Sequence, residues 1–181
     1  MDLAGCIHSE KELICAYRKA EFTKRKMQMK RYYIAYGSNL NVRQMKYRCP
    51  TAKIAGTAVI RDYELLYKGS KTGSYLTIEK KKGSLVPVAV WKVTAADEHS
   101  LDIYEGYPNF YYKKNMKIRL SETGKTVDAF VYIMHEERRL GIPTPAYVST
   151  CKFGYTIFGF DFKYLDEAYE KSLKGVANNE K

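Results

Sequence analysis

Strand-like segments follow one another along the middle of this chain without a helix between them. They lie at about 54–60, 63–68, 74–79 and 86–93, and glycines separate them. Two more follow at about 111–120 and 126–134. Strands that are neighbours in sequence pair mostly antiparallel, and the regular strand–helix alternation of a doubly wound fold is missing. We therefore predict an α+β fold in which about seven short strands form a small mixed, mostly antiparallel β-barrel with flanking helices.

The first strand and the helices have clear local signals. Residues 32–36 are a continuous apolar run that ends at Gly37, which is typical of a buried strand. The run Lys80–Lys82 before Gly83 is typical of a solvent-exposed hairpin tip. Gly106 follows a helical segment and suits a left-handed C-cap. Helices are predicted over 41–48, from Thr94 to about Glu105, near 145–154 and over 163–175.

One domain with short appendages is expected. The chain has 181 residues, 45% of them hydrophobic and 28% charged, which is enough to form a core without a metal or disulfides. Residues 1–29 are interpreted as a helical, basic extension with an amphipathic helix from about 10 to 24. Three interpretations of this extension stay open: it packs on the domain, it binds a partner, or it is an addition to a domain that is already complete without it. Residues 30–162 form the domain, and 163–181 form a C-terminal helix with a polar tail.

Charge and cysteine content limit the classes of function. The formal net charge is +11, but the basic residues are spread along the chain, so nucleic acid is not an expected partner. No apolar stretch approaches the roughly 18 residues of a membrane span, and no apolar signal segment is evident. We expect a cytoplasmic protein without a membrane partner. The four cysteines lack CxxC spacing and are expected to be reduced: Cys6, Cys15, Cys49 and Cys151.

The familiar catalytic motifs are missing from the sequence. It contains no GxGxxG, GxxxxGK[ST], HExxH or GxSxG. The three histidines, His8, His99 and His135, lie in unrelated contexts. We therefore expect neither a metal site nor a Ser-His-Asp or Cys-His hydrolase, and no cofactor is predicted.

The turn after the first strand is one candidate site. Residues 36–40, Tyr-Gly-Ser-Asn-Leu, join the buried strand to a helix, and Gly37 allows a ligand to approach the backbone closely. Unpaired N–H groups of the first helical turn and the positive end of the helix dipole can bind an anion such as a carboxylate. The alternative is an ordinary strand-to-helix turn.

Glu105 is the second candidate. It lies at the C-terminal end of its predicted helix, where the dipole disfavours a negative charge. Partial burial among Tyr104, Tyr107 and Tyr111 would disfavour it further, and both effects raise the pKa of a carboxyl towards that of a useful general base. The alternative is a solvated glutamate before a C-cap glycine.

In these segments the chain resembles the γ-glutamylcyclotransferase-like family, which includes the AIG2-like proteins. The resemblance covers about residues 31–161 in the family's order. It departs at Ala146, where the family has a serine after the proline, and residues before 30 lie outside it. The matching motifs are Tyr36–Leu40, Leu101-Asp102 with Glu105-Gly106, Pro108–Tyr111, and Pro145–Tyr147 with Gly154.

The resemblance implies a compact mixed barrel with a cavity at its mouth, and an enzyme that is a cyclising transferase or lyase acting on a small γ-glutamyl substrate. It implies that Glu105 is the catalytic residue that transfers the proton. The substrate-binding residues that it implies are Tyr36, Gly37, Ser38, Asn39 and Leu40 in the turn, with Tyr111 and Tyr147 as walls.

This chemistry is compatible with the residues present. In a γ-glutamyl amine, the α-amino nitrogen attacks its own γ-carbonyl carbon, closes the 5-oxoproline ring and expels the amine. The nucleophile belongs to the substrate, so the protein needs no serine, cysteine or metal. A carboxylate must take a proton from the α-ammonium group and return one to the leaving nitrogen, while N–H donors meet the developing oxyanion.

Several alternatives stay open from sequence. The leaving amine could belong to an amino acid, a polyamine-like group, a lysine-derived isopeptide or an aminoglycoside-type intermediate. A non-catalytic binding module could use the same cavity for a small acidic metabolite. A basic adaptor could bind nucleic acid through the N-terminal arm. The oligomeric state is not predicted.

Overall fold

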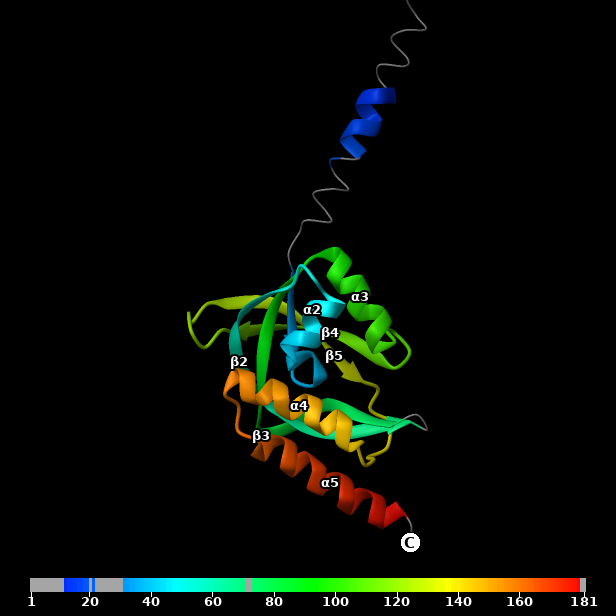
Figure 1. The fold of residues 1–181 in the computed structure, drawn as a ribbon, viewed down its shortest axis with the longest axis vertical. Coiled ribbons are helices and arrows are strands. Elements are labelled where there is room, and N and C mark those ends of the chain that lie inside the picture. The colour runs from blue at the N-terminus through cyan, green and yellow to red at the C-terminus, as the bar shows by residue number, and fades with distance from the viewer. Residues whose placement is uncertain (1–11, 20, 22–30, 71–72, 180–181) are drawn as a thin grey trace, which may run out of the picture.

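The computed structural model describes residues 12–19, 21, 31–70 and 73–179 (Figure 1). Residues 12–19 are helical, with Leu13, Ile14 and Tyr17 exposed, and the rest of the helix predicted at 10–24 lies largely outside the described residues. The other elements are β1 (Arg31–Ala35), η1 (Ser38–Leu40), α2 (Val42–Arg48), β2 (Lys53–Ser70), β3 (Gly73–Val93), α3 (Ala95–Glu105), β4 (Tyr111–Arg119), β5 (Thr126–Met134), α4 (Pro145–Phe158) and α5 (Lys163–Asn179).

The five strands form one mixed, mostly antiparallel sheet in the order β2-β3-β1-β5-β4. Strand β1 lies in its centre, antiparallel to β3 and parallel to β5. The predicted α+β class is therefore confirmed. The sheet is not closed into a barrel, because β2 and β4 remain its edges. Just after β4, the chain contacts the opposite edge strand β2. Ser121 N–H donates to Thr57 O at 2.8 Å, and the Glu122 carboxylate accepts from Thr57 N–H at 2.8 Å.

The four strand-like segments between residues 54 and 93 are two long strands, which corrects the predicted number. The register of β2 against β3 shifts between Arg61 and Tyr63. Asp62 lies there at a φ of 59°, and its Oδ1 accepts from Gly83 N–H at 2.8 Å. The glycine and lysine run at 80–83 therefore marks an irregularity inside β3, and the antiparallel pairing of β2 with β3 extends to the pair Ser70 and Gly73.

The helix ends follow the sequence signals closely. Asn41 caps α2 by accepting from Arg43 N–H at 3.1 Å. Thr94 and Asp97 form a capping box at the start of α3, and Gly106 ends that helix in the left-handed region at a φ of 62°. Helices α4 and α5 are longer than predicted. Among the described residues, no helix is both long enough and apolar enough to cross a membrane.

The helices pack on the strands and turns that build the site. In Figure 1, α3 lies at the upper right, and α4 runs above α5 across the lower part of the molecule. Helix α4 packs on η1, and α5 packs on β2. A Cβ at Gly154 of α4 would lie 2.4 Å from Leu40 Cβ, so only glycine allows α4 this close to η1. This contact fixes the turn after β1 against α4.

Candidate active site

The two candidate segments meet in the folded chain. Glu105 is the last residue of α3, and its Oε1 accepts a hydrogen bond from Asn39 Nδ2 at 2.7 Å. The two residues lie 66 positions apart in sequence. The same Asn39 amide donates to Tyr33 Oη at 2.8 Å. The end of α3 and the turn after β1 therefore form one polar centre.

A small inner pocket lies at this centre and a larger chamber adjoins it. The inner pocket has a volume of about 30 Å³ and the outer chamber about 310 Å³. Ser38, Glu105, Tyr111 and Tyr147 line both, so the Glu105 carboxyl lies where they join. The inner pocket is further lined by Tyr33, Tyr36, Gly37, Asn39, Leu76 and Tyr132. The outer chamber is further lined by Tyr75, Ile103, Tyr104, Gly106 and Phe110.

Hydrogen bonds to backbone groups hold three of the five tyrosine rings of the inner pocket. Tyr36 Oη donates to Tyr132 O at 2.6 Å. Tyr111 Oη donates to Leu76 O at 2.9 Å, and Leu76 N–H donates to Tyr147 Oη at 3.1 Å. These three hydroxyls bond to strand backbone, so this part of the pocket wall is fixed before any ligand arrives.

The Glu105 carboxyl has the acidity of a group that can both take and give a proton near neutral pH. Burial raises its pKa from 4.5 to about 7, although the Arg48 cation and the hydrogen bond from Asn39 act in the opposite direction. Desolvation, rather than the helix dipole, is thus the main cause. Burial also raises the pKa values of Tyr33, Tyr36 and Tyr111, so their hydroxyls stay neutral.

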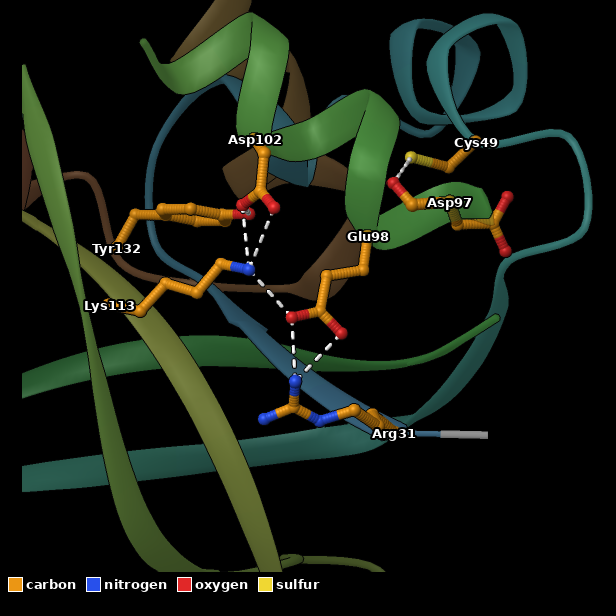
Figure 2. Close-up of polar contacts among 7 residues, drawn as sticks. All are labelled: Arg31, Cys49, Asp97, Glu98, Asp102, Lys113 and Tyr132. Atoms are coloured by element: carbon orange, nitrogen blue, oxygen red, sulfur yellow. Dashed lines mark hydrogen bonds and ion pairs between the residues drawn. The ribbon is translucent and has the colours of Figure 1, made fainter. Parts of the chain in front are cut away.

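A charged network anchors α3 to the sheet (Figure 2). Glu98 lies 2.6 Å from Arg31 of β1 and 2.6 Å from Lys113 of β4. Lys113 also lies 2.7 Å from Asp102, which accepts from Tyr132 Oη of β5 at 2.6 Å. Glu98 and Asp102 share a helix face with the residue three positions further along, Glu105. The network therefore fixes the helix that carries Glu105, and it reaches the pocket wall through Tyr132.

The structure gathers most of the sequence-predicted site residues. Leu40 is the one that it does not bring to either pocket, since its side chain is fully buried against α4. Tyr104 lines the outer chamber, whereas Tyr107 lines neither pocket. The sequence-predicted site residues that line the inner pocket are Tyr36, Gly37, Ser38, Asn39, Glu105, Tyr111 and Tyr147.

Sequence reasoning missed several residues of the site. Tyr33 and Tyr132 lie in apolar strand segments, where a tyrosine is most simply read as a core residue. Arg48 is the last residue of a short predicted helix and has no motif around it. The alternating faces of a strand could have pointed to Tyr33, but nothing in the sequence brings Arg48 to Asn39. The described residues contain no group of three or more His, Cys, Asp or Glu side chains that could hold a metal ion.

Comparison with known proteins gives a consistent result. The family model described as "Gamma-glutamyl cyclotransferase, AIG2-like" matches residues 33–149. The chain is 29% identical over 156 residues to the gamma-glutamylcyclotransferase of Homo sapiens, covering 82% of this chain and 79% of that protein. The solved structure of a gamma-glutamyl cyclotransferase superposes with a TM-score of 0.67 at 27% identity, over 77% of this chain and 86% of that one. YkqA from Bacillus subtilis, at 15% identity and a TM-score of 0.66 over 85% of this chain and 58% of that one, shares the fold.

Proposed function

Because the chain belongs to the AIG2-like gamma-glutamyl cyclotransferase family, we propose that it cyclises a γ-glutamyl amine and releases 5-oxoproline and the free amine. The observation that carries this proposal is the 2.7 Å contact between Asn39 Nδ2 and Glu105 Oε1 at the junction of the two pockets. This contact links two parts of the site. The turn after β1, which contains Asn39, is suited to binding a carboxylate, and the Glu105 carboxyl is suited to proton transfer.

The turn after β1 is the proposed binding site for the γ-glutamyl group. Ser38 and Asn39 are the first residues of η1, so their backbone N–H groups have no partner within that helix. These N–H groups are the proposed donors to the α-carboxylate or to the developing oxyanion. Gly37 brings the backbone close to Tyr147, since a Cβ there would lie 3.2 Å from Tyr147 Oη. Leu40 supports the turn by packing against α4.

Glu105 is the proposed proton carrier. Its ionised form takes a proton from the substrate's α-ammonium group, and the free amine attacks the γ-carbonyl carbon. A C–N bond forms within the ring, and the bond to the leaving nitrogen breaks as Glu105 returns the proton to that nitrogen. Glu105 then takes the second proton of the attacking nitrogen and passes it to the departing amine, which leaves as an ammonium ion, so the carboxylate is regenerated. A carboxyl with a pKa of about 7 suits both steps, and such proton transfer contributes roughly 10²–10⁴-fold to a rate.

The outer chamber is the proposed place for the leaving amine. It opens beside the same carboxyl and is lined by the rings of Tyr75, Tyr104 and Phe110. The Tyr75 and Phe110 rings pack edge to face with centroids 6.2 Å apart. An amine half with an apolar body would gain contact area there.

The test is Glu105→Gln assayed by mass spectrometry for 5-oxoproline with a set of γ-glutamyl amines. We expect the variant to fold normally and to lose roughly 10²-fold or more of the turnover. Glu167→Gln is the matched control, because Glu167 is exposed on α5, away from both pockets. Near-wild-type turnover by Glu105→Gln would refute the role of Glu105. Wild-type protein that binds γ-glutamyl amines without releasing 5-oxoproline would instead identify a non-catalytic binding module.

A further inference from the structure

Arg48, at the end of α2, contacts the active-site amide from the side opposite to Glu105. Its Nη1 donates a short hydrogen bond to Asn39 Oδ1. Its Nη2 donates to Gln44 Oε1 at 3.1 Å, one helical turn earlier on α2. The guanidinium also stacks on the ring of Tyr104, with Cζ 3.4 Å from the ring centroid. Arg48 therefore joins α2, the turn after β1 and the last turn of α3.

We propose that Arg48 is a positioning residue that fixes which end of the Asn39 amide faces Glu105. The inference rests on the proposed function, since it assigns a role within that same site. An asparagine amide has nearly the same shape in its two flipped orientations, but its oxygen only accepts and its nitrogen only donates. A guanidinium only donates, so Arg48 selects the orientation in which Oδ1 faces it.

The orientation of the Asn39 amide determines whether its nitrogen or its oxygen contacts the Glu105 carboxyl. With Oδ1 held by Arg48, Nδ2 faces the opposite way and donates both to Tyr33 Oη and to Glu105 Oε1. In the flipped orientation an amide oxygen would face the carboxylate, and their repulsion would displace Glu105 from the junction of the pockets. Arg48 thus acts on the proposed base through Asn39.

The arginine is itself held on two sides. Gln44 binds one end of the guanidinium, and the ring of Tyr104 covers its face. Tyr104 directly precedes Glu105, and its Oη lies 3.3 Å from Ser38 Oγ. The contacts therefore close a ring from Arg48 through Asn39 and Glu105 to Tyr104, and a displaced Arg48 would disturb the turn and the end of α3 together.

The charge of Arg48 has a separate consequence. It lowers the pKa of Glu105, which burial raises to about 7. On α3 itself, Asp102 is already paired with Lys113. Six further titratable side chains that interact with Glu105 have pKa values raised by burial and stay neutral; they are Tyr33, Tyr36, Cys49, Tyr111, Tyr132 and Tyr147. Removal of the arginine should therefore raise the pKa of Glu105 further, because the Arg48 cation favours the ionised carboxylate.

The experiment compares Arg48→Met, Arg48→Lys and the control Arg43→Met in the full chain. Arg43 lies on the same helix and stacks on Phe153 at 5.3 Å, but it is exposed and lies outside both pockets. For Arg48→Met we expect kcat to fall about tenfold or more and the acidic inflection of the kcat–pH profile to rise by about one unit. Arg48→Lys should have the acidic inflection of wild type but not its kcat, because lysine keeps the positive charge and lacks the planar set of N–H donors of a guanidinium. Arg43→Met should behave as wild type.

A double variant and a titration separate positioning from general support of the fold. If Arg48 acts through Asn39, then Arg48→Met should cost little extra rate once Asn39→Ala is present. Additive losses, or an unchanged inflection in Arg48→Met, would overturn the inference. Carbon-13 NMR of the Glu105 carboxyl gives its titration midpoint without any turnover. A wild type that makes no 5-oxoproline would therefore end the proposed function, while an unmoved midpoint in Arg48→Met would end the inference about Arg48.

Discussion

The Glu105 carboxyl holds its proton more tightly in the folded protein than in the unfolded chain. Its pKa is about 7 in the fold, against the ordinary value of 4.5. Between these pH values the folded state binds more protons, so the stability that the protonated form contributes is lost as the pH rises from about 4.5 to about 7. A residue suited to proton transfer thus makes the fold less stable at neutral pH than in mild acid.

Glu105→Gln should remove this dependence, since glutamine imitates the neutral acid. We expect the free energy of unfolding of the variant, relative to that of wild type, to be about 1–2 kcal/mol higher at pH 8 than at pH 5. This is less than the full pKa shift implies, because Glu105 is only half-buried. Urea unfolding at the two pH values measures the difference, with Glu167→Gln as control. Wild-type and variant stabilities that change in parallel with pH would contradict the pKa shift.

Single residues also mark the limit of the sequence evidence. The resemblance named Glu105 and Asn39, because their motifs are local runs that can be read directly. Arg48 and Tyr33 were not predicted to belong to the site, because they reach it only through contacts with Asn39 in the folded chain. Leu40 belongs to the same motif yet is fully buried in the core. A motif therefore predicted where the site lies but not which of its members face the pocket.

At the scale of elements, helix α3 depends on charges for its position. Its Glu98 and Asp102 side chains are only 12% and 25% exposed, and Lys113, itself 17% exposed, contacts both. Two carboxylates in such surroundings repel each other unless a cation lies between them. Arg31 adds a second cation at Glu98 only. Lys113 is therefore the cation that joins both carboxylates, one helical turn apart on α3, to β4.

Lys113→Met should destabilise the protein by about 2–4 kcal/mol, because it leaves two partly buried carboxylates without their shared cation. Lys117→Met is the matched control, since Lys117 lies on the same strand and is exposed. We expect that control to remain within about 0.5 kcal/mol of wild type. Urea unfolding at pH 7 measures both, and equal stabilities of the two variants would show that the network of Figure 2 does not anchor α3.

Helix ends were more predictable than strand lengths, for a physical reason. Caps such as Thr94 with Asp97, or Gly106, satisfy backbone groups within a few residues, so their signals are local. Glycines in strands are ambiguous, because a turn and an irregularity inside a strand both need them. At Gly83 the second applies, and the predicted hairpin tip is part of β3. The parallel pairing of β1 with β5 had no local signal.

At the scale of the whole molecule, the outer chamber is built from parts that are distant in sequence. Tyr75 comes from β3, Phe110 precedes β4 and Tyr147 comes from α4. The Tyr75 ring packs against both others, with centroids 6.2 Å from Phe110 and 5.1 Å from Tyr147. The fold thus assembles one aromatic wall beside Glu105.

This wall predicts a preference for the leaving amine. We expect kcat/KM for γ-glutamyl-benzylamine to exceed that for γ-glutamyl-methylamine by about tenfold, because the ring of the amine gains apolar contact. Phe110→Ala should reduce that ratio. Phe162→Ala should leave it unchanged, since Phe162 lies outside both pockets. Release of 5-oxoproline measures both substrates, and an equal ratio in wild type and Phe110→Ala would exclude the chamber as the amine site.

The place of β1 in the sheet also affects how the protein is made. The strand comes early in the chain, yet its neighbours are β3, which ends at Val93, and β5, which begins at Thr126. During translation β1 leaves the ribosome long before its second neighbour has been synthesised, and contacts so distant in sequence form slowly. The walls of the inner pocket include Tyr132 of β5 and Tyr147 of α4, so the pocket cannot be complete until most of the chain has been synthesised.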